Sequence, residues 1–321
     1  MTVVSESCEA VKCLVISDGR RGIENQALGL AEACAALQPL SIQTQHIQHN
    51  TFVAALPPGL QLRVARFELP ECDIAIGCGR QAIAPLLKLK RDNPAIFTVY
   101  IQDPRISPDA FDLVIAPEHD GLNGPNVINM IGSPNRVTET RIIGETLKFA
   151  AGLAKLPSPK TAFLIGGTSK THMLTPDDHA SHLAHAKTLY AAGHSLLITT
   201  SRRTPDFARE AWTDFASESD RIWLYDGNGP NPYFAFLGAA DLILVTEDST
   251  NMLTEACGTG KPVYRLQMSG KAGKFQTLYG ALELRCDAVS YTGQLSGADF
   301  LPLDETTRAA QELWNRFKSS P

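Results

Sequence analysis

The sequence lacks the signals that mark membrane-spanning and secreted proteins. No run of apolar residues approaches the roughly 18 that a membrane-spanning helix needs, so we expect no transmembrane segment. The opening stretch, MTVVSESCEA, has neither the basic start nor the apolar core of a secretory signal. We therefore expect a soluble, cytoplasmic protein.

Positive charge and paired cysteines are also scarce. The 29 lysines and arginines are outnumbered by 34 aspartates and glutamates, which gives a net charge of -5 and argues against a nucleic-acid partner. Seven cysteines are scattered along the chain without a Cys-x-x-Cys pair. This usage predicts reduced thiols rather than a disulfide framework or a zinc site.

Two nucleotide-binding motifs are incomplete. Residues 258–261 (GTGK) look like the end of a P-loop, but Glu255 stands where the motif needs glycine. Pro262 replaces the hydroxyl residue that would hold magnesium. Residues 77–79 (GCG) lack the third glycine of a dinucleotide-binding loop. The sequence therefore argues against a P-loop nucleotidase and against a Rossmann dehydrogenase.

The chain does contain two rounds of short apolar segments that alternate with helix-sized segments. Such alternation predicts parallel sheets with helices on both faces. A segment with two prolines, 152–160 (GLAKLPSPK), separates the rounds and is typical of a linker. We expect two doubly wound, Rossmann-like α/β domains, 1–154 and 155–304, followed by an amphipathic helix over 305–317. The expected strands are 11–16, 74–76, 97–100, 113–115, 127–128, 162–165, 196–198, 222–224, 242–245 and 262–264.

Acidic and hydroxyl side chains follow the expected strand 242–245. In open α/β sheets, ligands bind beyond the carboxyl ends of the strands. Ser249 or Thr250 can cap a helix that Gly258 ends, and the amides at a helix N-terminus favour phosphate. Glu255, about one turn into that helix, can accept hydrogen bonds from both hydroxyls of a ribose. This stretch therefore indicates a nucleotide site.

Several segments together resemble a known family. Glu247 and Glu255 have the spacing of a glutamate pair in the donor-binding segment of GT-B glycosyltransferases. Nearly the whole chain resembles bacterial relatives of the plant mitochondrial-fission ELM (elongated mitochondria) family. The resemblance implies a GT-B-like fold, with a central cleft between two Rossmann-like domains and residues 305–321 packed back on the first. Its segments are SDGRRGIENQALGL, QDPR, FDLVIAPEHDG, LIGGTSK, NPYFAFLGAADLILVTEDSTNMLTEA and GTGKPVY.

The resemblance also implies an activity. It implies a metal-independent glycosyltransferase that moves a sugar from a nucleotide-diphosphate donor to a cell-envelope glycoconjugate or lipid acceptor. The nucleotide sugar is a substrate, so no cofactor is expected. The second domain would bind the donor through Gly166, Gly167, Thr168, Ser169, Ser201, Arg202, Asn231, Glu247, Asp248, Ser249, Thr250 and Glu255.

The first domain offers glycine- and arginine-containing loops after two of its strands, for which we expect acceptor or diphosphate contacts. If the reaction inverts, a carboxylate must take the acceptor proton, and Asp18 is the first candidate, followed by Glu24 and Asp103. Each of these acids can instead be structural, for example as a helix cap. The acceptor-side residues are Gly19, Arg20, Gly22, Asn25, Gly77, Gly79 and Arg80.

Other interpretations stay open. A GT-B-like epimerase would share the donor site, and a non-catalytic, membrane-peripheral scaffold would keep a vestigial pocket. The histidines His179, His182 and His185 are interpreted as a solvated helix face rather than a metal site. Residues 85–91 (PLLKLKR) are either an ordinary helix surface or a contact with an acidic acceptor or with an anionic membrane, here the cytoplasmic face of the inner membrane.

Overall fold

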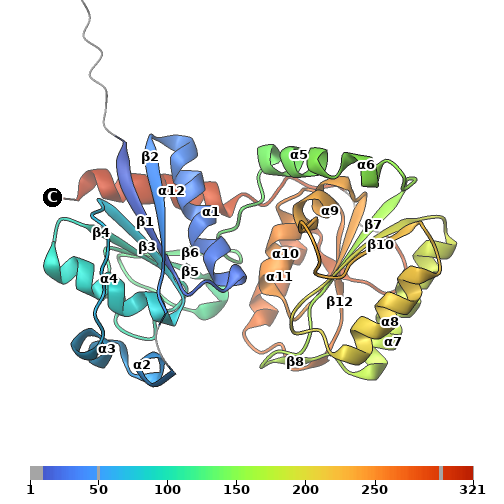
Figure 1. Cartoon of the computed structure of the whole chain (residues 1–321), viewed down its shortest axis with the longest axis horizontal. Helices are drawn as coiled ribbons and strands as arrows, with labels where there is room; N and C mark the ends of the chain where they lie inside the picture. Colours follow the sequence, from blue (N-terminus) through green and yellow to red (C-terminus); the bar gives the residue numbers. More distant parts are fainter. Residues whose placement is uncertain (1–9, 49–50, 296–298, 321) are drawn as a thin grey trace, which may run out of the picture. The chain divides into compact units, whose positions relative to one another are not determined.

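The computed structural model describes residues 10–48, 51–295 and 299–320. These residues form two compact units (Figure 1). Unit 1 runs to Arg136 and resumes at Asp304, and unit 2 comprises Val137–Leu303. Each unit contains a parallel sheet of six strands, so the predicted fold class is confirmed.

Unit 1 has the strand order β2-β1-β3-β4-β5-β6, with every neighbouring pair parallel. Every residue of β3, β4 and β5 is buried, because helices cover both faces, and their sequences are accordingly continuous apolar runs. The strands are β1 (Val11–Ser17), β2 (Leu40–His46), β3 (Ile74–Cys78), β4 (Phe97–Ile101), β5 (Leu113–Pro117) and β6 (Val127–Met130).

Two helical layers enclose this sheet. The core on one face includes residues of α1 and α12, and the core on the other includes residues of α4. Trp314 of α12 donates a hydrogen bond from its indole N–H to the carbonyl oxygen of Cys34 in α1, at 3.0 Å. The helices of unit 1 are α1 (Arg21–Leu37), α2 (Thr51–Ala55), α3 (Pro58–Val64), α4 (Arg80–Asp92) and α12 (Glu305–Ser319), with short 3-10 turns at Pro108–Ala110 and Glu118–Asp120.

Unit 2 has the strand order β10-β9-β7-β11-β12-β14, again with parallel neighbours. A separate antiparallel pair, β8 with β13, lies beside the sheet. The strands are β7 (Lys160–Ile165), β8 (His172–Met173), β9 (Ser195–Thr200), β10 (Ile222–Tyr225), β11 (Leu242–Thr246), β12 (Val263–Leu266), β13 (Ser269–Gly270) and β14 (Val289–Ser290).

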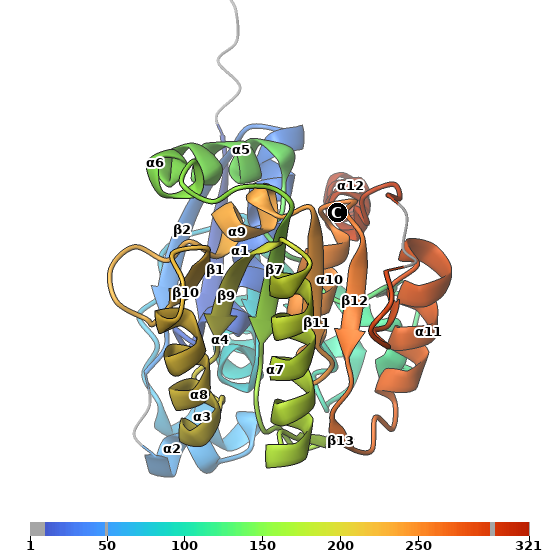
Figure 2. The same cartoon turned by 90° about the vertical axis from the view of Figure 1, so that its right-hand side faces the viewer.

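Helices cover both faces of the second sheet. One core combines α7 and α8 with inward-facing residues of the strands, and these two helices lie in front of the sheet in Figure 2. Helices α9 and α10 contact β7, β11 and β12. The helices of unit 2 are α5 (Glu139–Lys148), α6 (Ala150–Leu153), α7 (Pro176–Ala191), α8 (Asp206–Ser217), α9 (Tyr233–Ala239), α10 (Thr250–Cys257) and α11 (Phe275–Cys286).

The chain passes from unit 1 to unit 2 at Arg136–Val137, and not within residues 152–160. The reason is tight packing of α5 and α6 inside unit 2. A Cβ atom at Gly238 of α9 would lie 2.2 Å from the Thr146 hydroxyl of α5, and one at Gly152 of α6 would lie 2.6 Å from the Trp223 ring. The two-proline segment is therefore a loop within unit 2 that leads into β7.

Within residues 10–48, 51–295 and 299–320, no helix combines the length and apolar character needed to cross a bilayer. Over the same described ranges, no group of three or more histidine, cysteine or acidic side chains is arranged to hold a metal ion.

Candidate functional site

The point where the strand order of unit 2 reverses is the natural place for a ligand. From β7 the order continues through β9 and β10 on one side and through β11, β12 and β14 on the other. The loops after β7 and β11 therefore diverge at the carboxyl edge, where doubly wound sheets bind ligands. Gly166 and Gly167 follow β7, and Glu247 and Asp248 follow β11, so the sheet brings the predicted donor loops together.

Asp248 joins these loops. Its side chain is fully enclosed, and its Oδ2 atom accepts hydrogen bonds from the Gly167 amide at 3.1 Å and the Arg203 guanidinium at 2.8 Å. Burial raises the pKa of the Asp248 carboxyl, while the Gly167 amide and Arg203 act to lower it. Asp248 therefore positions its neighbours and does not itself line an open surface.

Gly166 and Gly167 occupy the junction of these loops because a side chain at either position would collide with its neighbours. A Cβ atom on Gly166 would lie 2.1 Å from Oδ1 of Asp248, and one on Gly167 would lie 2.0 Å from the carbonyl oxygen of Arg203. Their amides are already engaged, since Gly166 donates to the Thr246 hydroxyl at 2.7 Å and Gly167 to Asp248. The pair thus serves close packing of the loops.

The next two residues of this loop are engaged in the same way. The amide of Thr168 donates to the carbonyl oxygen of Arg203 at 3.3 Å, and that of Ser169 donates to the carbonyl oxygen of His172 at 2.8 Å. In this conformation the amides from Gly166 to Ser169 hold the loop itself, which leaves phosphate contacts to side chains and to other elements.

Arg203, the neighbour of the predicted donor contact Arg202, is the basic group that the structure places at this junction. Its side chain is 46% exposed while Asp248 holds one end of it, so the guanidinium is both fixed and accessible. Ser201 builds the turn beneath it, because its hydroxyl accepts from the Arg203 amide at 3.1 Å. Arg202, the predicted donor contact, is exposed in the same turn. The adjacent arginines 202 and 203 mark this loop in the sequence. Only the geometry of the turn shows that Arg203, and not Arg202, contacts Asp248.

Glu255 occupies a different environment from the exposed carboxylate that the sequence suggested. Only 7% of the residue is exposed, and Oε2 accepts a hydrogen bond from the Tyr233 hydroxyl at 2.6 Å. Burial raises the pKa of the Glu255 carboxyl to about 7. Tyr233 starts α9, where its amide donates to the side chain of Asn231 at 3.0 Å. Helices α9 and α10 therefore share a buried carboxyl–phenol pair.

The remaining donor-loop residues build α10 and its support. Ser249 is the N-cap of α10, its hydroxyl accepting from the Met252 amide at 3.4 Å, and Thr250 begins the helix, as the sequence indicated. Glu247 turns toward the β12–β13 connection, where Oε1 accepts from the Met268 amide at 2.8 Å. Arg265 lies 4.0 Å from its other oxygen.

The side chain of Lys261, the residue that suggested a P-loop, caps the C-terminal end of α9. Its ammonium donates hydrogen bonds to the carbonyl oxygens of Leu237 at 2.8 Å and Gly238 at 2.5 Å, which are among the last carbonyls of α9. Burial lowers the pKa of the Lys261 amine to about 8. The side chain therefore satisfies backbone groups that a helix end leaves open.

The predicted histidine face is not solvated. His179 and His182 are buried, and burial lowers the pKa of both. The Nε2 atom of His182 lies 2.8 Å from the carbonyl oxygen of Gln267, and His179 packs edge-on against Trp212. The expectation of a solvated face was wrong because α8 and the β12–β13 connection cover this side of α7, which the helix sequence cannot show.

In unit 1 the candidate bases lie at the carboxyl edge, each beside a cation or histidine. Asp18 pairs with Arg20 at 2.7 Å, across the left-handed turn at Gly19. Asp103 accepts from the amide of Arg105 at 2.8 Å and lies 3.0 Å from its guanidinium. Glu24, in the first turn of α1, lies 2.5 Å from Nε2 of His46.

The acceptor-side residues divide into loop and packing positions. A Cβ atom on Gly77 would lie 2.7 Å from a methyl group of Leu86 in α4, so Gly77 serves packing. Gly79 has a left-handed backbone, with φ of 81°, and begins α4 as its N-cap. Arg80 donates to the carbonyl oxygens at the end of α2, Gly22 accepts through its carbonyl from a glutamine side chain, and Asn25 accepts from Arg136 at 3.5 Å.

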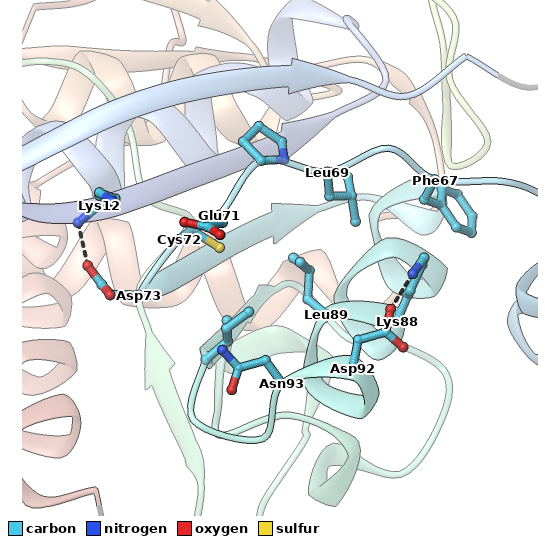
Figure 3. Close-up of a pocket in the computed structure, with 12 residues that line it drawn as sticks. Lys12, Phe67, Leu69, Glu71, Cys72, Asp73, Lys88, Leu89, Asp92 and Asn93 are labelled. Atoms are coloured by element: carbon cyan, nitrogen blue, oxygen red, sulfur yellow. Dashed lines mark hydrogen bonds and ion pairs between the residues drawn. The ribbon is translucent and has the colours of Figure 1, made fainter.

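A hollow of about 540 Å³ lies at the opposite, amino edge of the unit 1 sheet (Figure 3). Within it, Asp73 accepts a hydrogen bond from the backbone amide of Lys12 at 2.8 Å, and Lys88 forms an ion pair with Asp92. Burial raises the pKa of the Cys72 thiol to about 11, so it is not a nucleophile at neutral pH. We assign no ligand to this hollow.

Comparison with solved structures defines the class of fold. A putative UDP-N-acetylglucosamine 2-epimerase from Listeria monocytogenes matches with a TM-score of 0.57 and 13% identity, over 97% of this chain and 96% of its own. The UDP-GlcNAc 2-epimerase of Methanocaldococcus jannaschii, solved with UDP-GlcNAc and UDP, matches with a TM-score of 0.50 and 12% identity, over 96% and 100%. Spinosyn forosaminyltransferase matches with a TM-score of 0.50 and 12% identity, over 97% of this chain and 96% of its own. The fold is GT-B-like.

Sequence comparison then gives the family. The model of the family described as "Mitochondrial fission ELM1" matches residues 21–317, so the chain belongs to this family, as its motifs suggested. The mitochondrial fission protein ELM1 of Arabidopsis thaliana is 27% identical over 268 residues, which are 75% of this chain and 62% of that protein. An uncharacterized Rickettsia prowazekii protein is 27% identical over 293 residues, 78% of this chain and 81% of its own.

Proposed function

We propose that this protein is a glycosyltransferase that takes a sugar from a nucleotide-diphosphate donor bound to unit 2. The observation that carries the proposal is Arg203, an accessible guanidinium held by the buried Asp248 where the order of the sheet reverses. A fixed cation there neutralises the diphosphate that leaves with the nucleotide, without a metal ion. The N-terminus of α10, which begins in the same loop region, adds an electrostatic preference for phosphate.

Glu255 is the proposed ribose contact. When ionised, a carboxylate accepts hydrogen bonds from both hydroxyls of a ribose, and Tyr233 donates to the same group. Glu255→Ala removes a charge-assisted bond of roughly 1.5–3 kcal/mol, which corresponds to about tenfold or more in donor affinity. Glu255→Gln loses less, because an amide oxygen still accepts one bond.

The acceptor is proposed to be a cell-envelope glycoconjugate or lipid, met at the cytoplasmic face of the membrane. Asp18 is the proposed base if the reaction inverts, because it is the carboxylate that directly follows β1, the strand at which the order of the unit 1 sheet reverses. Its pairing with Arg20 keeps the carboxylate oriented. Asp18→Asn then removes transfer while donor affinity remains, since Asp18 lies in unit 1.

Calorimetric titration with UDP, and with the other nucleoside diphosphates, tests donor binding. UDP comes first because two of the similar folds were solved with UDP. Arg203→Ala is expected to lower diphosphate affinity about tenfold or more through loss of a charge-assisted bond. Arg209→Ala, at a partly exposed arginine of α8 in the same unit, is the matched control. Absence of binding by any nucleoside diphosphate or its sugar would leave the non-catalytic scaffold as the function.

An epimerase is the second candidate, because several proteins of similar fold are named as UDP-GlcNAc 2-epimerases. The two activities separate in one assay. UDP-GlcNAc is incubated with the protein, with and without a membrane extract as acceptor, and the sugar products are analysed. Conversion of the free nucleotide sugar without acceptor supports the epimerase, and sugar transfer that needs the extract supports the transferase.

A further inference from the structure

The basic segment that the sequence offered for membrane contact is packed into unit 1. Pro85, Leu86 and Leu89 of α4 are buried, so its apolar side chains face the core. Lys90 donates to the carboxylate of Asp112 at 2.8 Å and to backbone carbonyl oxygens. Within residues 85–91 only Leu87 among the apolar side chains is partly exposed, so a membrane contact needs another element.

Helices α2 and α3 do present such a surface. Phe52 is 72% exposed, Leu60 45% and Val64 57%, although all three are large apolar side chains. Leu60 and Val64 are four residues apart in α3 and share one face of it. We name Phe52, Leu60, Val64, Arg63 and Arg66 the α2–α3 surface, since both arginines are also exposed.

The inner side of this helix pair is anchored by hydrogen bonds. The buried Gln61 amide donates to the carbonyl oxygens of Val53 and Leu56, both at 3.1 Å. Arg80 donates to those of Ala55 at 2.9 Å and Leu56 at 3.1 Å, and Gln81 to that of Ala54 at 3.2 Å. The carbonyls at the end of α2 are thus satisfied within the protein. This favours contact with a lipid interface, because fewer backbone groups remain to be satisfied where water becomes scarce.

The charge of the segment that carries the α2–α3 surface indicates which kind of partner it binds. Residues 47–67 contain Arg63 and Arg66 and no aspartate or glutamate, in a chain whose net charge is -5, and the next acid is Glu68. Apolar and aromatic side chains with arginines among them match the interface of a bilayer that carries anionic lipids. An uncharged apolar partner would not explain why this segment contains arginines and no acidic residue.

We propose that the α2–α3 surface docks unit 1 on an anionic membrane. Phe52, Leu60 and Val64 enter the boundary between headgroups and acyl chains, and the two arginines meet lipid phosphates. The proposal does not depend on donor binding, which involves unit 2. It supplies a means by which a protein without an observed spanning helix in its described residues reaches a lipid acceptor.

Co-sedimentation of the full chain with vesicles tests the proposal. The vesicles contain phosphatidylglycerol mixed with phosphatidylcholine, or phosphatidylcholine alone, at low and high salt. We expect binding to the anionic vesicles that weakens with salt. Arg63→Glu with Arg66→Glu should lower it by well over tenfold, because each arginine near an anionic surface contributes about fivefold and each reversal adds repulsion.

A triple variant and matched controls separate docking from misfolding. Phe52→Ser with Leu60→Ser and Val64→Ser should abolish vesicle binding while circular dichroism and UDP titration stay as in the wild type. Leu147→Ser with Leu284→Ser changes exposed leucines of unit 2, at 69% and 92% exposure, and should bind vesicles normally. Arg91→Glu, in the segment first suspected, should also bind normally.

Three outcomes would overturn the proposal. The folded wild type would fail to bind anionic vesicles, or the triple serine variant would bind them as well as the wild type does. The third is a concentration-dependent dimer in solution that the triple serine variant abolishes, which would make the surface an interface between copies of the chain. None of these outcomes bears on UDP affinity, so the proposed function is tested separately.

Discussion

Buried ionisable groups determine much of the chemistry at the scale of single residues. Glu255 is expected to make stability depend on pH, because burial raises the pKa of its carboxyl from 4.5 to about 7. Between these values the folded protein binds more protons than the unfolded chain, so the stabilising contribution present below pH 4.5 is lost as pH rises through 7. Glu255→Gln should flatten this decline and raise the free energy of unfolding at pH 8 by roughly 1–3 kcal/mol.

Urea denaturation from pH 4.5 to pH 8 measures this effect. Glu210→Gln, at an exposed position of α8 in the same unit, serves as the control and should follow the wild-type profile. Parallel profiles for wild type and Glu255→Gln would show that Glu255 titrates normally, which would contradict its enclosed pairing with Tyr233.

Gly166 is expected to tolerate no side chain. A methyl group there would lie 2.1 Å from Asp248, whose carboxylate is held by Gly167 and Arg203 and has no room to move away. Gly166→Ala should destabilise the protein by about 1–3 kcal/mol or more through overpacking. Gly280→Ala is the matched control, because nothing lies within 4 Å of its added Cβ atom in α11, and it should be neutral or stabilising. Thermal denaturation of both variants decides the matter.

Residue types at the site were easier to predict than residue roles. The loops after the strands pointed to Gly166, Asp248 and Glu255, and the sheet does bring these loops to one edge. Their partners are residues far apart in sequence, such as Gly167 and Asp248, which are 81 positions apart. Sequence pattern therefore could not show that the glycine amides are engaged, or that Arg203 rather than Arg202 pairs with the acid.

At the scale of elements, the cap that Lys261 provides for α9 should matter more for stability than for ligand binding. Lys261→Met keeps the apolar stem and removes the two hydrogen bonds to Leu237 and Gly238. We expect a loss of about 1–2 kcal/mol in the free energy of unfolding. Affinity for UDP should stay nearly unchanged, since the lysine faces backbone carbonyls. A large loss of affinity with normal stability would restore the phosphate-binding interpretation of the motif.

Elements with strong local signals were predicted well. The continuous apolar runs became the central strands, as predicted, and the capping box of Thr175 and Asp178 is a comparably local signal at the start of α7. Strand β2 (LSIQTQH) was not predicted, because it lies at the sheet edge and alternates partly buried with exposed residues. The short helices α2 and α3 were also missed, since five and seven residues carry little periodicity.

At the scale of the whole molecule, α12 should stabilise unit 1 specifically. Trp314 is 5% exposed in a core shared with α1, and its indole also donates to Cys34. Trp314→Ala should cost roughly 3–5 kcal/mol by opening a cavity. Denaturation followed by circular dichroism should show the loss, while titration should find the affinity of unit 2 for UDP intact. Asn315→Ala, at an exposed position of the same helix, should change neither.

The division of the chain was predictable in kind and not in position. The restart of the strand pattern indicated two units. The prolines at 157 and 159 suggested a boundary within residues 152–160, whereas the units meet at Arg136–Val137. What decides the boundary is that α5 packs against α9, a contact between helices some 90 residues apart. Composition cannot reveal such a contact.

The place of α12 has a consequence for how the chain folds during synthesis. Every strand and helix of unit 2 has been translated once the ribosome passes Leu303, so that unit needs no later segment of the chain to complete its core. The earlier-made strands of unit 1 must wait for Glu305–Ser319 before the apolar side chains of α1 are covered. The part of the protein that is made first is therefore the part that is finished last, and its apolar α1 face stays open until α12 is added.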